Sequence, residues 1–296
     1  DSISSILLVS RARKAGLVIT PRNVFQHQNI AALASVAVAL DTQSALADVA
    51  VGPLPLTPIV HWLRERGGPI NRFSQSMLLQ VPAGMQKAHL IATLQTLLDH
   101  HDALRMRLDI SETASGAATW LSEIPPAAAI RAEDCLHQID MIDLHEDGLR
   151  VLVADASRAA TARLDPAAGR MLQAVWFDAG SALPGRLLLS IHHLAVDGVS
   201  WRILVPDLEV AWQAAQRGEA AKLEPCGSSL RRWALQLKVE ASRATRVAEL
   251  PLWTSITSAP DPLLSPRPLD ASRETVPTAR RLTLTLPSAL TSVLLT

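Results

Sequence analysis

Two adjacent histidines follow a run of apolar residues, and they are the side chains of this sequence best suited to proton transfer. Residues 187–191 are almost uninterruptedly apolar, and His192 and His193 come directly after them. An imidazole has an ordinary pKa of about 6.5, so it can take up and return a proton at neutral pH. Asp197 and Gly198 complete the group. The pattern favours general acid/base chemistry, with a pair of buried structural histidines as the alternative.

A buried β-strand over residues 187–193 is expected to deliver both imidazoles to its end, where catalytic groups are commonly displayed. Side chains alternate along a strand, so His192 is expected to point away from the site as a structural residue and His193 to face it. Gly198 is expected to let the chain turn sharply. Ser200 is expected to cap a helix that begins near Trp201.

Two other polar groups have structural interpretations that we favour. His100, His101 and Asp102 stand at the expected end of a helix, where charged imidazoles would offset the helix dipole, so capping is favoured over catalysis. The second group is Asp143, His145, Glu146 and Asp147. It precedes a glycine and is expected to be a solvated turn rather than a metal site.

Composition and motifs exclude several classes of function. The 296 residues carry 28 Lys+Arg and 28 Asp+Glu, so no general positive field favours nucleic acid as a partner. The longest apolar run, residues 30–40, is too short to span a bilayer, and no signal-peptide pattern opens the sequence. We therefore expect a cytoplasmic protein with no membrane partner. Common hydrolase, dinucleotide and nucleotide motifs are lacking. Cys135 and Cys226 are far apart, which predicts neither a disulfide framework nor a metal site.

Mixed helical and strand patterns along the chain predict an α/β fold, an α+β sandwich. Helices are expected at 3–15, 30–40, from Pro58, and at 86–101, and strands at 77–81, 104–108, 149–153, 172–178, 187–193 and 281–286. Pro206 is expected to kink or divide the helix near Trp201. Residues 251–277 are rich in proline and are expected to be extended. Residues 41–53 have the composition of a linker, which places a domain boundary near residue 50.

The histidine pair belongs to a longer motif. Residues 192–198 resemble the HHxxxDG signature of the condensation-domain superfamily of nonribosomal peptide synthetases, and residues 199–204 resemble its epimerization branch. Residues 55–62, 100–105 and 227–233 are similar to further motifs of that branch. The resemblance implies a chloramphenicol-acetyltransferase-like architecture of two lobes with a tunnel between them. Residues 54–296 would be the N-terminal lobe.

Residues 1–40 resemble a different unit, the C-terminal part of a small helical peptidyl carrier domain. Asp1-Ser2-Ile3 is similar to the carrier motif whose serine accepts 4′-phosphopantetheine, which implies Ser2 as the attachment site; an ordinary helix N-cap is the alternative. The sequence begins with Asp1 rather than methionine. We therefore expect an excerpt of a longer synthetase, containing part of a carrier, a linker at 41–53 and one lobe of a tunnel enzyme.

The resemblance implies inversion of the α-carbon of an aminoacyl or peptidyl thioester held on a carrier domain of the same synthetase. In this interpretation His193 is the general acid/base, His192 is structural, and Asp197 is an architectural anion paired with an arginine. Arg105 is the candidate partner by its motif position, and Gly198 supports the turn. No metal is implied. One lobe alone is expected to be inactive. Peptide-bond formation by the same histidine and an inactive carrier-docking module remain as alternatives.

Overall fold

The computed structural model describes residues 2–39, 48–112, 118–141, 146–259, 270, 272–275 and 278–295. The chain divides into two compact units, Asp1–Ser242 and Arg243–Thr296. The first unit contains the histidine pair and the sheets of the described residues.

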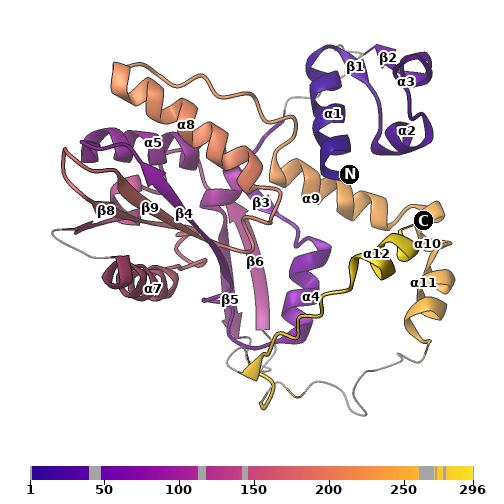
Figure 1. Ribbon diagram of the computed structural model, residues 1–296. Helices are drawn as coiled ribbons and strands as arrows, with labels where there is room; N and C mark the ends of the chain where they lie inside the picture. Colours follow the sequence, from indigo (N-terminus) through magenta and orange to yellow (C-terminus); the bar gives the residue numbers. More distant parts are fainter. Residues whose placement is uncertain are drawn as a thin grey trace. The chain divides into compact units, whose positions relative to one another are not determined.

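A four-stranded sheet carries the histidine pair, with strand order β4-β9-β8-β7 (Figure 1). Its strands are β4 (Ser74–Val81), β7 (Leu136–Asp140), β8 (Leu172–Asp178) and β9 (Gly185–His192). β9 is antiparallel to both of its neighbours, and β7 is parallel to β8. The strands predicted at 77–81, 172–178 and 187–193 are confirmed, within a few residues at their ends.

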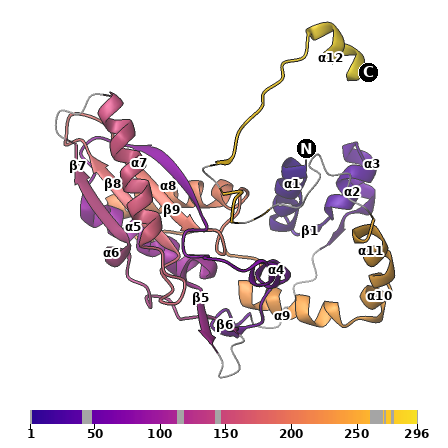
Figure 2. The ribbon, with the colours of Figure 1, turned by 90° about the horizontal axis from the view of Figure 1, so that it is seen from below.

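Helices cover both faces of this sheet. α5 (Lys87–His100) and α8 (Trp201–Arg217) pack against each other on one face, and α7 (Glu146–Ala162) lies on the other. Figure 1 shows α5 and α8 above β8 and β9 and α7 below them, and Figure 2, seen from below, shows α7 in front of these strands. Alternation along β8 sends Leu172 and Ala174 into the core with α5, and Val175 and Phe177 into the core with α7. Burial on both faces explains why β8 and β9 are nearly continuous apolar runs.

A second sheet has the strand order β3-β6-β5 and is antiparallel throughout. Its strands are β3 (Gly52–Leu54), β5 (Arg107–Glu112) and β6 (Ala118–Ile124). α9 (Leu230–Ala241) packs beside β3 through a small core that contains Leu54 and Ala234. Gly52 and Pro53, which the sequence placed in the linker, are thus part of a sheet. Residues 41–47 of that linker lie outside the described residues. The remaining elements of this part are α4 (Pro58–Arg66), the 3-10 helix η1 (Asp102–Arg105) and α6 (Ala132–Cys135).

Several predicted elements differ from those in the structure. Residues 149–153 alternate like a strand, but they lie in α7, whose longer pattern buries Ala156 and Ala160 one turn apart. Residues 104–108 form the end of η1 and the start of β5, because the Arg105 side chain is buried instead of facing solvent. Pro206 lies inside a single continuous α8, so it does not divide the helix. Residues 281–286 are described but belong to no strand.

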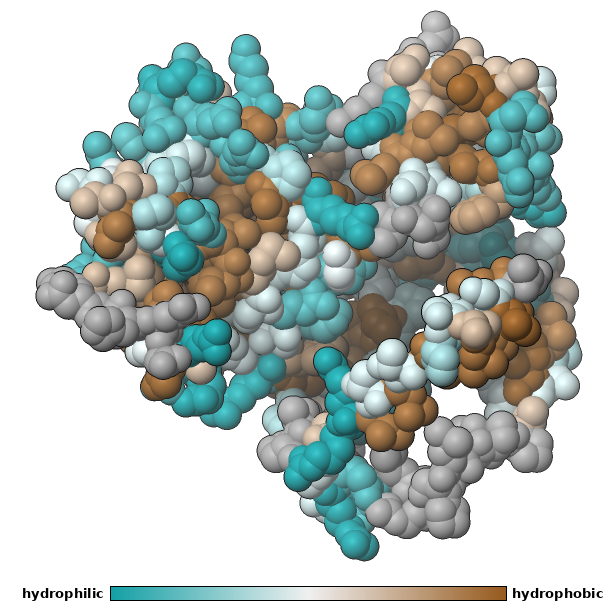
Figure 3. Space-filling model, viewed as in Figure 1, coloured by the Kyte–Doolittle hydropathy of each residue, from teal (hydrophilic) through white to brown (hydrophobic). Residues whose placement is uncertain are grey.

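Residues 2–39 form a small segment of short elements. They are α1 (Ser2–Lys14), β1 (Leu17–Val18), α2 (Pro21–Gln26), α3 (Ile30–Val36) and β2 (Val38–Ala39), with β1 and β2 antiparallel. The helix predicted at 3–15 is confirmed, and the one predicted at 30–40 is shorter than expected. Thr20 caps α2 through a reciprocal pair of bonds with Asn23. Figure 3 shows hydrophobic surface over this segment, where the exposed large apolar residues are Ile6, Leu7, Leu8, Leu17, Val18, Phe25, Ile30 and Val38.

The second unit contains α10 (Ala244–Val247), α11 (Leu250–Thr257) and α12 (Ser288–Leu294). Residues 250–257 are helical instead of extended, because Pro251 lies in the first turn of α11, where its missing N–H breaks no helical hydrogen bond. The rest of the 251–277 prediction falls largely outside the described residues. Within the part of the chain that the structure describes, every helix is too short or too polar to cross a membrane.

Candidate active site at the end of strand β9

His193 is the first residue after β9, and the fold fixes both the orientation of its ring and the position of its proton. Its Nδ1 lies 2.8 Å from the carbonyl oxygen of Val196. A carbonyl only accepts hydrogen bonds, so Nδ1 carries the proton and the neutral ring presents its lone pair at Nε2. The ring also stacks on Phe73, with centroids 4.7 Å apart and planes 19° apart. The tautomer suited to a general base is therefore preorganised.

Gln75 and Trp201 extend this arrangement away from His193. The Gln75 side-chain nitrogen lies 3.2 Å from His193 Nε2, and the Trp201 indole N–H donates to Gln75 Oε1 at 2.9 Å. An indole N–H can only donate, so the Gln75 oxygen must face Trp201 and its amide NH2 must face His193. This chain of hydrogen bonds, the Trp201–Gln75–His193 relay, makes His193 Nε2 an acceptor.

His192 is fully buried, at 0% exposure, and both of its ring nitrogens are occupied. Nε2 donates to the Ile70 carbonyl at 2.9 Å, and Nδ1 accepts from the backbone N–H of Leu194 at 3.2 Å. Burial lowers the pKa of His192; the Ile70 carbonyl opposes the shift and His193 adds to it. With both nitrogens engaged, the ring is positioned to support the turn that presents His193.

The free energy of unfolding is expected to decrease as the pH falls below about 6.5, because His192 stays neutral when folded and takes up a proton when unfolded. One such group contributes a slope of at most about 1.4 kcal/mol per pH unit. His101, whose pKa is also lowered, adds to the slope with the same sign.

Urea unfolding at several pH values between about 7.5 and 5.5 measures this dependence. His192→Gln keeps a donor for Ile70 but cannot titrate, so the variant is expected to be less stable at every pH and to have a shallower slope. A slope identical to that of the parent chain would contradict the assignment to His192.

The predicted pairing of Asp197 with Arg105 was wrong. Asp197 is exposed, and its Oδ1 accepts from the backbone N–H groups of Val199 and Ser200 at 3.0 and 2.9 Å and from the Ser200 hydroxyl at 2.8 Å. Burial tends to raise the pKa of Asp197, but the bonds from Ser200 and Val199 hold it below its usual value. The carboxylate of Asp197 is therefore hydrogen-bonded within its own turn, instead of being paired with a distant arginine.

Arg105 is buried, with 5% of its surface exposed, and it binds backbone carbonyls instead of Asp197. Nε donates to the Pro125 carbonyl at 3.0 Å, and Nη1 donates to the carbonyls of Leu98 and Asp99 at 2.9 and 3.0 Å. The last carbonyls of a helix lack intrahelical partners, and Arg105 supplies one for the end of α5. Its role is to join α5 to the segment that follows β6.

Two expectations for the turn after β9 were also wrong. Gly198 lies outside the left-handed region of backbone conformations, and a Cβ placed there would meet no atom within 4 Å, so the turn does not require glycine. Ser200 does not cap α8 with its side chain but bonds to Asp197. The two residues close the turn by reciprocal bonds.

His100, His101 and Asp102 lie at the end of α5, as predicted, and each binds a different part of the chain. His100 Nε2 lies 2.9 Å from the Glu224 carbonyl, His101 Nε2 lies 2.9 Å from Asp207 Oδ2, and Asp102 accepts from the first N–H of α9 at 2.8 Å. Burial and then His100 lower the pKa of His101, while Asp207 raises it. The lowered pKa argues against a cationic cap at His101. Of the other predicted group, Asp143 and His145 lie outside the described residues.

Comparison with known proteins places this geometry in a family. Residues 68–295 match the family model described as the condensation domain. The chain belongs to the condensation-domain family. It is 36% identical over 301 residues to one of the linear gramicidin synthase proteins of Brevibacillus parabrevis, covering 100% of this chain and 4% of that protein. It is 34% identical over 273 residues to chondramide synthase cmdD of Chondromyces crocatus, covering 90% of this chain and 7% of that protein.

Two solved structures are similar to this chain in fold. The epimerization domain from the third module of tyrocidine synthetase B is similar with a TM-score of 0.63 at 24% identity, covering 74% of this chain and 47% of that domain. The first condensation domain of the calcium-dependent antibiotic synthetase is similar with a TM-score of 0.56 at 20% identity, covering 72% of this chain and 49% of that domain. At these identities the similarity establishes the chloramphenicol-acetyltransferase-like fold. This condensation-family chain spans 4% to 8% of the length of the curated relatives it matches and about half of these solved domains.

Sequence reasoning missed two residues that the structure brings to His193, namely Phe73 and Gln75. Both lie more than a hundred residues before it and belong to no local motif that suggests chemistry. Ser74 pairs with His192 across β4 and β9, and this register is what sets both residues beside the imidazole. A prediction from the sequence that β4 pairs with β9 in this register would have placed Phe73 and Gln75 beside His193.

Proposed function

We propose that this condensation-family chain is part of a nonribosomal peptide synthetase and epimerizes a carrier-tethered aminoacyl or peptidyl thioester at its α-carbon. The observation that carries the proposal is the fixed tautomer of His193, with Nε2 as its acceptor atom. Trp201 favours epimerization in particular, because this residue of the epimerization-like motif is bonded into the site through Gln75. The similarity to an epimerization domain supports the same choice at the level of fold.

In the proposed reaction His193 Nε2 removes the α-proton of the thioester. A thioester α-carbon is a much weaker acid than imidazolium, so the base must be held within hydrogen-bond reach and the enolate oxygen must be stabilised. His193 meets the first requirement through Val196 and Phe73. Return of a proton to the opposite face needs a second acid, which the resemblance assigns to a glutamate-containing motif of the second lobe. Tethering makes the encounter intramolecular and raises the effective concentration of substrate.

Residues 2–39 are, in this proposal, the C-terminal part of a peptidyl carrier domain, with 4′-phosphopantetheine on Ser2. Three short helices suit a small helical carrier, and Ser2 is the first residue of α1. The alignment with the linear gramicidin synthase protein spans the whole chain, including this segment. The partners are the carrier domains of the same synthetase and the thioesters they hold. Mass spectrometry of the Ser2 peptide from the intact synthetase is expected to show one phosphopantetheine, which Ser2→Ala removes.

Peptide-bond formation is the second candidate function, because the matching family model is that of condensation domains. Chiral analysis of the thioester hydrolysed from the intact synthetase module separates the candidates. A mixture of D and L products from one loaded carrier supports epimerization, and a dipeptide that requires two loaded carriers supports condensation. Carrier binding without either product supports an inactive docking module. Either of the last two results would overturn the proposal.

Gln75→Glu is expected to reduce epimerization strongly while the fold is retained. A carboxylate at this position can still accept from Trp201, but it replaces the NH2 donor with an acceptor next to His193 Nε2. A neighbouring negative charge favours the imidazolium form, which cannot accept a proton. The loss is expected to be partly relieved at higher pH, so the pH profile of α-deuterium exchange tests the prediction.

Gln75→Leu is the matched control, since it removes both hydrogen bonds without adding charge. It is expected to destabilise the chain by about 1–3 kcal/mol, because the buried Trp201 N–H loses its acceptor. Its α-deuterium exchange is not expected to recover at higher pH. Equal pH profiles for the two variants would contradict the relay.

A further inference from the structure

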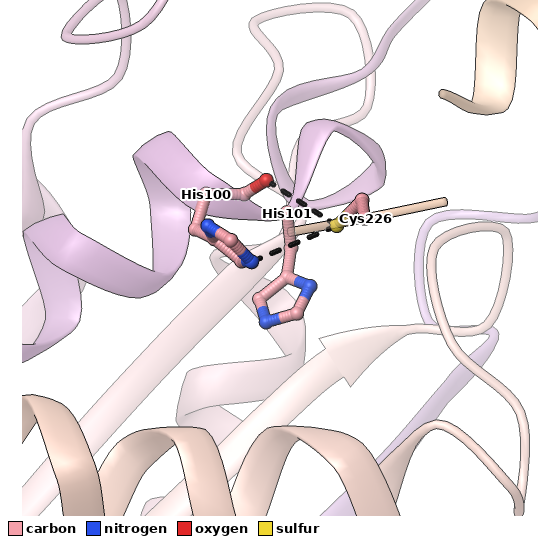
Figure 4. A group of neighbouring side chains, drawn as sticks. All are labelled: His100, His101 and Cys226. Atoms are coloured by element: carbon pink, nitrogen blue, oxygen red, sulfur yellow. Dashed lines mark hydrogen bonds between the residues drawn. The ribbon is translucent and has the colours of Figure 1, made fainter. Parts of the chain in front are cut away.

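Two histidines and a cysteine that are distant in sequence converge beyond the end of α5. His100 and His101 come from the helix end, and Cys226 comes from the segment between α8 and α9 (Figure 4). One ligand atom of each lies within 4.8 Å of the others. Zinc binds imidazole nitrogen at about 2.0–2.1 Å and thiolate sulfur at about 2.3 Å, so tetrahedral ligand atoms stand roughly 3.3–3.8 Å apart. The 3.7 Å between Cys226 Sγ and His100 Nε2 has that spacing.

Asp207 orients His101 in the way that a metal site requires. A carboxylate only accepts hydrogen bonds, so the His101 Nε2 that lies 2.9 Å from Asp207 carries the proton, and the neutral ring keeps its lone pair on Nδ1. Figure 4 shows one ring nitrogen of His101 on the side of Cys226. Histidine ligands of metals commonly donate their second ring N–H to a carboxylate. Asp207 on α8 occupies that supporting position.

The electrostatic surroundings also favour a cation. Asp207 is hydrogen-bonded to His101, and Asp102 is the residue that follows His101. Carboxylates this close to the three ligands favour a divalent cation beside them. His100 Nε2 is hydrogen-bonded to the Glu224 carbonyl, and metal binding must exchange this bond for the metal bond. Glu224 lies two residues from Cys226. A movement of this one segment would therefore release His100 Nε2 from the Glu224 carbonyl and bring the Cys226 sulfur to the metal.

We propose that His100, His101 and Cys226 bind a divalent transition-metal ion of the zinc class, with Asp207 as the positioning residue for His101. Two imidazoles and one thiolate select zinc over magnesium or calcium, which prefer oxygen ligands. Three protein ligands leave the fourth position for water. The ion would fasten the segment that leads into α9 to the end of α5. The site is independent of His193 and of the reaction proposed above.

Titration of the chain with Co²⁺ tests the site, since cobalt substitutes for zinc and reports thiolate ligation by a near-ultraviolet charge-transfer band. One Co²⁺ per chain is expected, with the band present and removed by added Zn²⁺. Cys226→Ser is expected to abolish the band, and His100→Ala is expected to weaken binding. Asp207→Asn is expected to reduce the affinity by roughly 10- to 100-fold with the band retained, which a merely structural aspartate would not do.

Matched controls separate the site from adventitious binding. His137→Ala removes an exposed histidine elsewhere, and Cys135→Ala removes the other cysteine, which is buried in the main core. Both are expected to bind Co²⁺ like the parent chain. The proposal is overturned if no stoichiometric Co²⁺ binds, if Cys226→Ser retains the band, or if removal of Cys135 is what abolishes it. Circular dichroism of each variant shows that the fold is retained.

Discussion

Replacement of His193 by alanine is expected to abolish deuterium wash-in at the α-carbon of the carrier-bound thioester while leaving the fold intact. General acid/base groups contribute roughly 10²- to 10⁴-fold to a rate, so exchange is expected to fall by at least about 100-fold. His193 lies after the last residue of β9 and is only partly buried, so the sheet does not depend on its ring. Mass spectrometry of the loaded carrier in deuterated buffer measures the rate.

The matched control is His61→Ala, which removes an exposed histidine of α4. It is expected to exchange at the parent rate. Undiminished exchange in the His193 variant would contradict its assignment as the base. Reduced exchange together with a lost circular dichroism signal would mean that the variant is unfolded. In that case His193→Gln, which retains a polar side chain of similar length, is measured, and parent-like exchange in that folded variant would equally reject the assignment.

Replacement of Arg105 by alanine is expected to be the most destabilising single change considered. It leaves three buried or partly buried carbonyls, those of Leu98, Asp99 and Pro125, without the donor that now serves them. An unsatisfied buried acceptor costs about 1–3 kcal/mol, so the free energy of unfolding is expected to fall by at least about 3 kcal/mol. Urea denaturation of the chain measures the loss.

Arg107→Ala is the matched control for Arg105, because the two arginines are two residues apart and Arg107 is half exposed, with a 3.6 Å ion pair to Glu123. Exposed pairs of this kind are worth up to about 1 kcal/mol. Arg105→Lys is expected to recover only part of the loss, since an ammonium group cannot reproduce the planar arrangement of donors. Equal stabilities for the Arg105 and Arg107 variants would contradict the role assigned to Arg105.

Long, strongly patterned elements of the fold could be predicted from the sequence, and shorter ones with ambiguous patterns could not. The leucine spacing of α5 and the apolar runs of β8 and β9 identify these elements, because tertiary burial reinforces the local pattern. The strand predicted at residues 149–153 was wrong because a short stretch of Leu, Arg and Val fits a strand and a helix equally well. Only the wider pattern of α7 decides between them.

The candidate site was predictable where its residues are adjacent in sequence and unpredictable where they meet through the fold. His192 and His193 are recognisable from their motif, and their different environments follow from strand alternation. The partners of Asp197 and Arg105 were assigned wrongly, because nothing in the sequence says that nearby backbone groups will satisfy both. The proximity of Cys226 to His100 could not be predicted for the same reason, because the two residues are 126 positions apart in the sequence.

The pairing of β4 with β9, from Ser74 opposite His192 to Val81 opposite Gly185, has a consequence for how this protein can change in length. Loop-closure entropy grows slowly with loop length, so insertions between the secondary-structure elements that separate β4 from β9 should be well tolerated. A single residue inserted within β4 after Gln75 would instead shift the pairing by one position and send side chains to the opposite face of the sheet. We expect deletions and insertions in natural or laboratory-evolved variants to spare the stretch from Phe73 to Val81 and to accumulate in the connections.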